Sequence, residues 1–433
     1  MKITRSLLGR VPAALLAAGL VAAPLSALAH DDHGSRHARP RLVGYFTSWA
    51  VYSAKNYTAK SVKTSGAAAR LTHIQYAFAN ITPDLKCGVS DPWADYQRPY
   101  PAADDVDGVD ETWSETEVRG HFNQLRKLKK LYPKLKVLIS VGGWTFSNRF
   151  SDAALTPASR QAFVSSCVDM FIKGNVGEGR TSGDLFDGID VDWEFPGACG
   201  NTCDFRPEDT QNFTLLMAEF RKQLDAAGRT SRKNYELAIA APVVESLYSK
   251  MELKRVARSL DFISIMGYDM HGSWELQTNF HAPLLPSSAD PAGKKLNVHT
   301  TVDAFLRAGV PRDKIVVGVP FYGRGWQGVP NVNHGLYQSA TGPAPGPVEV
   351  GSMDYRDLAP IAAVQGSFRD LRTQGHWIYN PATGMFWGYD DAFAVRIKGE
   401  YVKLRGLGGN MFWELSQDST GGTLVRALHA GQN

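Results

Sequence analysis

Three carboxyl side chains recur at every second position of the segment DGIDVDWE, which runs from Asp187 to Glu194. Side chains of a β-strand alternate between two faces with a period of two. The alternation places Asp190, Asp192 and Glu194 on one face, opposite three apolar residues. Three like charges in a confined interior cannot all ionise cheaply, so at least one pKa must rise. A carboxyl that keeps its proton near neutral pH is what a general acid requires.

Two other interpretations fit alternating acids taken alone. An antiparallel strand with one solvated face would show the same pattern, and an Asp-x-Asp pair could hold Mg²⁺ or Ca²⁺. An EF-hand loop does not fit, because the segment lacks Gly at loop position six and Glu at position twelve. The segment ending in Asp269 offers Met266 and Tyr268 beside it, which are poor ligands for a hard cation. We therefore predict neither a metal nor a cofactor.

The elements that must position these acids form a regular series. Eight apolar or β-branched runs predict strands at residues 41–46, 73–81, 136–143, 186–195, 235–242, 261–269, 314–323 and 409–415. Most alternate with amphipathic segments, such as 116–131, 159–173, 208–227, 299–309 and 392–404. Alternating strands and helices favour parallel βαβ units, and eight units favour an α/β fold of the (β/α)8 (TIM) barrel type. A doubly wound sheet is disfavoured because no GxGxxG turn follows the first strand.

One connection is far longer than a crossover needs. Residues 326–391 are rich in Gly, Pro, Tyr and Trp, so we expect a small α+β insertion domain there, between strands seven and eight. The barrel would comprise residues 41–325 and 392–433. A second long connection, residues 82–115, is expected above the barrel. Active sites of such barrels lie at the C-terminal ends of the strands, which is where Glu194 falls.

The N-terminus predicts export. Residues 1–29 combine three basic residues, an apolar run too short to span a bilayer and the small-x-small site Ala27-Leu28-Ala29, which is typical of a secretory signal peptide. A membrane anchor is the alternative. Residues 30–40 are expected to be a disordered lead-in. In an oxidising compartment Cys199 and Cys203 could close a small ring, whereas Cys167 could be a buried free thiol.

Composition narrows the class of partner. The 433 residues are 43% hydrophobic and 21% charged, which is ordinary for a globular protein. The formal charge of +4 falls to +1 once the signal segment is removed, so nucleic-acid binding is not expected. No later stretch could span a membrane, and we expect a monomer. The informative feature of the composition is its aromatic content, with 10 Trp, 16 Tyr and 20 Phe.

The segment DGIDVDWEFPG closely resembles the DxxDxDxE signature of the family 18 glycoside hydrolases, the chitinases. Further segments match in order: SVGGW at 140–144, MGYD at 266–269, PFYGR at 320–324 and GNMFWEL at 409–415. The match covers residues 41–430. It implies a secreted enzyme that hydrolyses β-1,4 bonds of chitin or chitooligosaccharides with retention. In this family the substrate's own acetamido oxygen is the nucleophile.

The resemblance assigns roles residue by residue. Glu194 would be the general acid and base, and Asp192 would hold the acetamido N–H. Asp190 would share a proton with Asp192, Tyr268 would orient the acetamido oxygen, and Asp187 would hold the top of the strand. Substrate contacts would come from Phe46, Phe78, Trp113, Gly142, Gly143, Trp144, Thr145, Phe195, Met266, Gly267, Asp269, Trp274, Glu275, Tyr322, Arg324 and Trp413. Of these, Phe46, Phe78 and Met266 could equally be core residues, since sugar rings and cores both use such side chains.

Two further functions stay open from the sequence. An endo-β-N-acetylglucosaminidase acting on N-glycan cores would use the same acid and the same acetamido chemistry. A non-catalytic chitin-binding lectin of the same fold typically lacks the acid, and Glu194 is present. One departure from the family pattern is Phe195, where many relatives carry Tyr. The ring is kept, so we expect no loss of activity.

Overall fold

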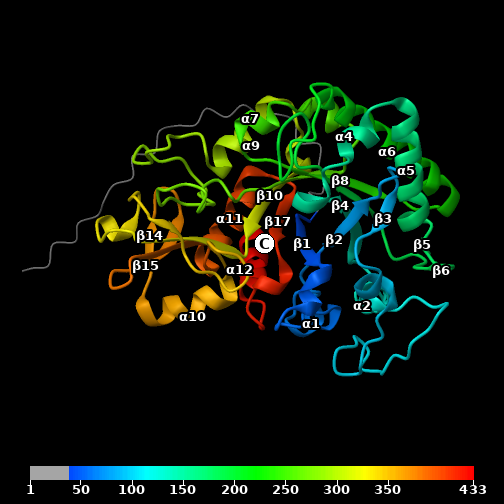
Figure 1. Ribbon diagram of the computed structural model, residues 1–433, viewed down its shortest axis with the longest axis horizontal. Coiled ribbons are helices and arrows are strands. Elements are labelled where there is room, and N and C mark those ends of the chain that lie inside the picture. The colour runs from blue at the N-terminus through cyan, green and yellow to red at the C-terminus, as the bar shows by residue number, and fades with distance from the viewer. Residues whose placement is uncertain (1–38) are drawn as a thin grey trace, which may run out of the picture. The chain divides into compact units, whose positions relative to one another are not determined.

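The structure is a computed structural model, and it describes residues 39–433. In this region eight strands run parallel: β1 (Arg41–Thr47), β2 (His73–Ile81), β4 (Lys136–Gly142), β7 (Gly188–Asp192), β8 (Glu236–Ala241), β9 (Phe262–Ile265), β10 (Ile315–Pro320) and β17 (Gly409–Trp413). They pair in the order β1-β17-β10-β9-β8-β7-β4-β2, and β1 also pairs with β2, which closes the sheet. The predicted (β/α)8 barrel is confirmed (Figure 1).

Helices follow the barrel strands, and the longer of these helices cover the outside of the barrel. They are α1 (Ala59–Thr64), α2 (Gly120–Leu131), α3 (Gly143–Phe146), α4 (Phe150–Ala154), α5 (Pro157–Cys167), α6 (Asp209–Ser231), α7 (Glu245–Tyr248), α8 (Leu253–Val256), α9 (Val298–Arg307), α11 (Ala392–Arg405) and α12 (Thr423–Gln432). Short 3₁₀ segments occupy Ser48–Tyr52, Arg312–Lys314, Asn333–Gly335 and Leu415–Gln417, and π-helical segments occupy Trp93–Gln97 and Val168–Ile172. Side-chain caps fix several helix starts: Asn297 accepts from the Thr300 amide, and Asp391 accepts from the Ala394 amide.

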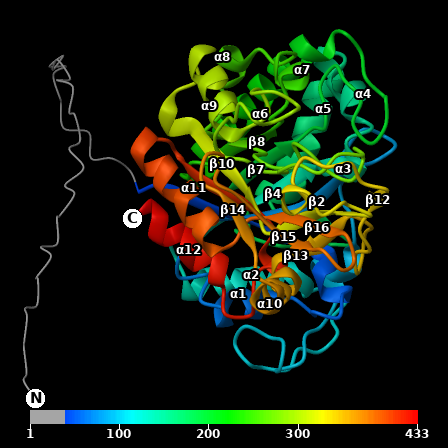
Figure 2. The same ribbon diagram turned by 90° about the vertical axis from the view of Figure 1, so that its left-hand side faces the viewer.

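A second sheet lies between β10 and β17 in the chain. It is antiparallel and comprises β11 (Tyr322–Gln327), β12 (Gly342–Pro343), β13 (Ser352–Asp354), β14 (Phe368–Asp370), β15 (Gly375–Asn380) and β16 (Met385–Tyr389), with helix α10 (Tyr355–Gln365) beside it. The sheet begins at Tyr322, earlier than the residue 326 expected, so Tyr322 and Arg324 belong to it. Figure 2 shows β13, β15 and β16 in front of the barrel strands, and residues 40–433 form one compact unit.

Apolar side chains divide into an inner and an outer layer, as the period of two requires. Outside the barrel wall, Ile189 and Val191 of β7 pack with the surrounding helices in the main core. Inside it, Val43, Leu138 and Phe262 belong to a smaller cluster. The antiparallel sheet has its own core, built from Phe280, Trp326, Val329, Leu336, Trp377, Tyr379 and Phe386.

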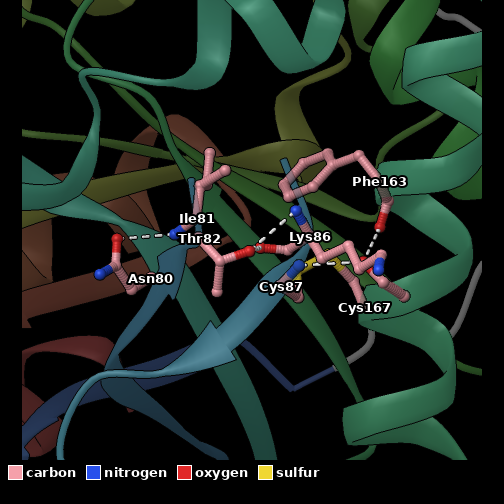
Figure 3. The surroundings of a disulfide bond; sticks show 8 residues. Asn80, Ile81, Thr82, Lys86, Cys87, Phe163 and Cys167 are labelled. Atoms are coloured by element: carbon pink, nitrogen blue, oxygen red, sulfur yellow. Dashed lines mark hydrogen bonds between the residues drawn. A yellow bond between two sulfur atoms is a disulfide. The ribbon is translucent and has the colours of Figure 1, made fainter. Parts of the chain in front are cut away.

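The described residues contain two disulfides and no free cysteine. Cys199 and Cys203 do close a small ring. The expectation of a free thiol at Cys167 is wrong, because its sulfur is bonded to Cys87. Figure 3 shows this bond between helix α5 and β3 (Cys87–Val89), an antiparallel extension of β2. The contact joins positions 80 residues apart, so it depends on β3 lying against α5 in the fold.

Two expectations concern the N-terminus and the membrane. The proposed signal peptide and nearly all of the lead-in lie outside the described residues. Within residues 39–433, no helix has the length and apolar character needed to cross a bilayer. A short hairpin, β5 (Asn175–Gly177) and β6 (Arg180–Thr181), completes the list of strands.

Candidate active site

Strand β7 and the two residues after it carry the acidic ladder, by which we mean Asp190, Asp192 and Glu194. The apolar residues between them lie in the outer core, so the ladder faces the barrel interior. Asp190 is 0% and Asp192 4% exposed, whereas Glu194, just beyond the last strand residue, is half-buried. The solvated-strand interpretation is therefore wrong, and the ladder runs from the closed interior to the C-terminal mouth of the barrel.

Burial sets the protonation of the ladder. It raises the pKa of Asp190 to about 6, although hydrogen bonds from Ser140 and Tyr45 oppose the rise. Burial, with the charges of Glu194 and Asp190 nearby, raises the pKa of Asp192 well above its usual range. Burial, with the charge of Asp269, raises the pKa of Glu194 to about 8. The outermost carboxyl is thus protonated at neutral pH.

Neighbouring strands hold the inner end of the ladder. The Tyr45 hydroxyl on β1 and the Ser140 hydroxyl on β4 donate to Asp190 Oδ2 over 2.8 and 2.7 Å. The other carboxyl oxygen of Asp190 is buried without a hydrogen-bond partner in the structure, and so is Oδ1 of Asp192. Buried carboxyl oxygens normally find partners. A proton held between these two side chains would satisfy that need.

The backbone beside the ladder is tightly packed. The Glu194 amide donates to Ser147 Oγ over 3.0 Å. Gly142, the last residue of β4, and Gly143 both have positive φ, and a Cβ on Gly142 would lie 2.3 Å from the Asp192 carbonyl oxygen. A Cβ on Gly143 would lie 2.5 Å from the Phe78 ring. Gly142 therefore lets β4 lie close to the ladder strand, and Gly143 leaves room for the Phe78 ring.

The remaining predicted polar groups lie in the segment just after strand β9, which ends at Ile265. Tyr268 is buried, and its hydroxyl lies 3.7 Å from Met411 Sδ on β17. Asp269 accepts from Arg324 through both oxygens, over 2.8 and 2.9 Å. Although burial acts to raise it, contacts with His281 and Arg324 hold the pKa of Asp269 well below its usual range. Asp269 is thus a fixed negative charge facing Glu194. The two residues before Tyr268 lie close by: Met266 packs on the inner cluster, and Gly267 abuts the Gly318 carbonyl.

An aromatic group surrounds the mouth of the barrel. Trp413, at the end of β17, stacks on Phe78 with ring centres 5.7 Å apart and lies 5.2 Å from Tyr45. Trp49 lies 6.2 Å from Trp413 and remains 47% exposed. Tyr322 is buried and packs edge-on against Tyr268. The structure therefore brings Phe78, Tyr322 and Trp413 together with the ladder's own neighbours.

Other predicted substrate contacts lie further out. Trp144, Thr145 and Trp274 are exposed, and Phe195 is half-buried. The Trp274 ring lies 5.4 Å from the Arg324 guanidinium, and the Glu275 carboxylate pairs with His271 over 2.8 Å. Trp113 stacks on Trp93, with ring centres 6.1 Å apart, and lies against Arg180. Trp113 thus belongs to an aromatic pair on the long loop of residues 82–115.

The structure places two of the predicted residues away from the ladder, and for Phe46 it favours the core alternative. Phe46 is fully buried in the outer core, stacked on Tyr76 and edge-on to His121, so it does not line the barrel interior. Asp187 does not hold the top of its strand. It precedes β7 at the opposite, N-terminal end, where its Oδ2 accepts from Lys129 Nζ and the Val137 amide over 2.6 and 2.8 Å.

Sequence reasoning also missed residues that the structure places at the site. Tyr45 is the inward neighbour of Phe46, and the alternation that applies to β7 applies to β1 as well. Ser140 and Ser147 contact the ladder, but Ser is too common a residue to be singled out by type. Trp49 lies two residues after the end of the first strand, which was the available signal for a residue at the mouth.

The residues around the ladder show whether this site is built to bind a metal ion. Among the residues that the structure describes, no group of three or more His, Cys, Asp or Glu side chains is arranged to hold a metal ion. The ladder's partners are instead hydroxyl groups. The arrangement can store protons on carboxyl groups and present one of them at the mouth of the barrel.

Comparison with known proteins gives a consistent result. The family model described as glycosyl hydrolases family 18 matches residues 41–418. Chitinase A1 of Niallia circulans is 38% identical over 87% of this chain and 56% of its own, and chitinase C of Streptomyces lividans is 37% identical over 88% and 58%. The chain thus spans just over half the length of these two relatives. The catalytic domain of psychrophilic chitinase B from Arthrobacter TAD20 superposes with a TM-score of 0.85 at 39% identity, covering 90% of this chain and 94% of that one.

Proposed function

This chain belongs to the glycosyl hydrolases of family 18, and from that premise we propose that it is a secreted chitinase. It hydrolyses β-1,4 bonds between N-acetylglucosamine units with retention at the anomeric carbon. The observation that carries the proposal is the buried ladder, whose outermost carboxyl, Glu194, has a pKa raised to about 8. A carboxyl that is protonated at neutral pH and placed at the mouth of a barrel is suited to protonate a leaving glycosidic oxygen.

The attacking atom comes from the substrate. Family 18 enzymes are exceptions to the two-carboxylate rule, because the acetamido oxygen of the bound sugar attacks C1. Glu194 gives its proton to the glycosidic oxygen as the C1–O bond breaks, and an oxazolinium intermediate forms. Glu194 then takes a proton from the water that opens this intermediate. Tyr268 orients the acetamido oxygen, and its buried hydroxyl, which has only a weak sulfur partner, supports that role.

Asp190 and Asp192, the two inner acids of the ladder, balance the charge that develops on the substrate. Asp192 accepts the acetamido N–H and offsets the positive charge that develops on the ring. Asp190 holds a proton with Asp192, which is supported by the unpartnered oxygen on each residue and by both raised pKa values. Hydrogen bonds from Tyr45 and Ser140 keep Asp190 in place while the proton moves.

The aromatic group supplies the sugar platform. Sugar rings present apolar C–H faces that stack on indole and phenol rings. Trp413 forms the floor beneath the reacting sugar, braced from behind by Phe78 and Tyr45. Trp144 and Trp274 extend the contact along the chain of sugars, supported by their large exposed faces. Two disulfides in the described region suit an oxidising, extracellular destination.

Product analysis tests the proposal. N-acetylglucosamine oligomers should be cleaved with the β anomer formed first, whereas glucosamine oligomers of equal length, which lack the nucleophile, should not be cut. Cello-oligomers are a second matched control. Equal rates on acetylated and deacetylated oligomers would contradict substrate-assisted catalysis. Cleavage of a high-mannose glycoprotein with no action on chitin would favour an endo-β-N-acetylglucosaminidase instead.

A further inference from the structure

The backbone of Glu194 is held from both sides. On the amide side, Ser147 Oγ accepts the Glu194 N–H over 3.0 Å and itself lies 2.8 Å from the Gly143 carbonyl oxygen. The same hydroxyl lies 3.0 Å from the Asp192 carbonyl oxygen. Ser147 therefore ties the peptide before Glu194 to the loop after β4. A different part of the chain contacts the peptide that follows Glu194.

Gly200 packs directly on the Glu194 carbonyl. A Cβ at position 200 would lie 2.0 Å from the Glu194 carbonyl oxygen and 2.8 Å from its carbon. No real Cβ atom approaches so closely, so only glycine fits. Gly200 is not among the glycines with positive φ, so its backbone conformation does not demand glycine. The requirement at position 200 is the close approach to Glu194.

A small covalent ring carries Gly200. The Cys199–Cys203 disulfide closes it, and the Gly200 amide donates across it to the Thr202 carbonyl over 3.0 Å. Both cysteines are exposed, so the ring adds nothing to the hydrophobic core. Beyond the ring the chain is anchored by buried Asp209, whose Oδ2 accepts the Arg206 amide over 2.8 Å. Asp209 also accepts a backbone hydrogen bond from Gly197, before the ring, so the exposed turn that carries Gly200 lies between two anchored segments and is closed by the disulfide.

We propose that the Cys199–Cys203 ring is a positioning element for Glu194. This inference rests on the proposed function of Glu194 as general acid. By constraining the loop, the disulfide keeps Gly200 against the Glu194 carbonyl and fixes the peptide between Glu194 and Phe195. The carboxyl then stays aimed at the glycosidic oxygen and sheltered from water. The ring itself touches neither substrate nor the reacting atoms.

The double variant Cys199→Ser/Cys203→Ser tests the proposal. A misplacement of about 1 Å at a reacting group can cost on the order of 10²-fold in rate. We expect kcat on N-acetylglucosamine oligomers to fall roughly ten- to a hundredfold with KM little changed. Since water would reach Glu194 more easily, the alkaline limb of the kcat/KM profile should move to lower pH. A merely structural role would lower Tm and leave that limb in place.

Gly200→Ala is an independent test that keeps the disulfide. Its methyl group would push the ring away from Glu194, so it should reproduce both the kcat loss and the shift of the alkaline limb. Gly342→Ala is the matched control, since a Cβ there meets nothing within 4 Å. Cys87→Ser/Cys167→Ser is the control for losing a disulfide, and it should lower Tm without moving the limb.

The outcomes separate the two proposals. If the wild-type protein releases no product from any oligomer, the proposed function fails. If the wild type is active while Gly200→Ala and the double variant keep its kcat and its alkaline limb, the positioning role is overturned. Should the double variant not fold, Gly200→Ala decides alone.

Discussion

The two ends of the barrel use the same kind of residue in opposite ways. At the N-terminal end, acidic side chains at the strand starts have basic partners: Asp187 with Lys129 over 2.6 Å, Asp261 with Arg221 over 3.2 Å, and Glu236 with Lys136. The His73 ring also contacts Glu236 over 2.8 Å. At the C-terminal end, none of the three ladder carboxyls is within ion-pair distance of a described base. Paired carboxylates stabilise a fold, whereas unpaired buried ones store protons at a cost in stability.

The pairing at the N-terminal end also fixes the strands. Asp187 Oδ2 accepts the Val137 amide of β4, and Asp261 Oδ2 accepts the Leu237 amide of β8, each over 2.8 Å. Each carboxylate thus bridges a base and the start of the neighbouring strand. The ladder carboxyls at the other end make no bond to a strand amide in the described structure, so they are free to exchange protons.

Removing the outermost ladder carboxyl should have the largest effect. Glu194→Gln takes away the general acid, and we expect oligomer hydrolysis to fall by roughly 10²–10⁴-fold or more while oligomer binding is kept. The same change should raise Tm increasingly as pH rises from the unfolded pKa of about 4.5, with the full gain above about 8, because wild-type folding must then protonate or bury an ionised carboxylate. Asp187→Asn is the matched control and should keep its activity. Near-normal rates in Glu194→Gln would mean that another group is the acid.

The pH profile of the wild type belongs to the same experiment. A general acid works in its protonated form, so kcat/KM should fall as pH rises through the pKa of Glu194, about 8. Glu194→Gln should show no such alkaline limb in its residual activity.

Replacing a paired carboxylate at the N-terminal end of the barrel should change the free energy of unfolding. Although burial opposes it, hydrogen bonds and charge from His73 and Lys136 lower the pKa of Glu236 to about 2. The shift corresponds to about 3 kcal/mol of unfolding free energy, fully present above the unfolded pKa of about 4.5 and lost as pH falls towards 2. Glu236→Gln should therefore be less stable at pH 7, with the gap to wild type narrowing in acid. Denaturant unfolding at several pH values measures this gap, and a gap independent of pH would refute the pairing.

A single hydroxyl gives the smallest and most selective test. Tyr45→Phe removes a donor that lowers the pKa of Asp190, so that pKa should rise further above its usual range. A hydrogen bond to a charged group contributes about 1.5–3 kcal/mol, so kcat/KM should fall roughly tenfold or more. Tyr76→Phe is the matched control, because its hydroxyl also donates to a buried carboxyl, Asp95, but on the outer face. Equal activity losses in both variants would show that the ladder has no special dependence on Tyr45.

Periodicity predicted the fold and the ladder because a barrel wall has only two faces. The same alternation places Asp187, an odd-numbered position, on the opposite face from the even-numbered ladder residues. It also places Tyr45 and Phe46 on opposite faces, so only one of them can face the barrel interior. Two adjacent aromatics hide this choice, since each is suited to either side of a strand. The Cys87–Cys167 bond could not be predicted, because it depends on β3 meeting α5 across 80 residues. The same limit applies to Gly200 and Glu194, whose contact depends on how the loop folds back.

Strand β17 lies between β1 and β10, so the wall closes where the earliest strand meets the latest. A nascent chain made from its N-terminus exposes two unpaired edges until residues 409–413 have emerged. The same five residues end in Trp413, beneath the expected sugar. The strand that closes the barrel therefore also supplies the proposed floor of the sugar site. A chain that lacks β17 has neither a closed barrel nor this floor.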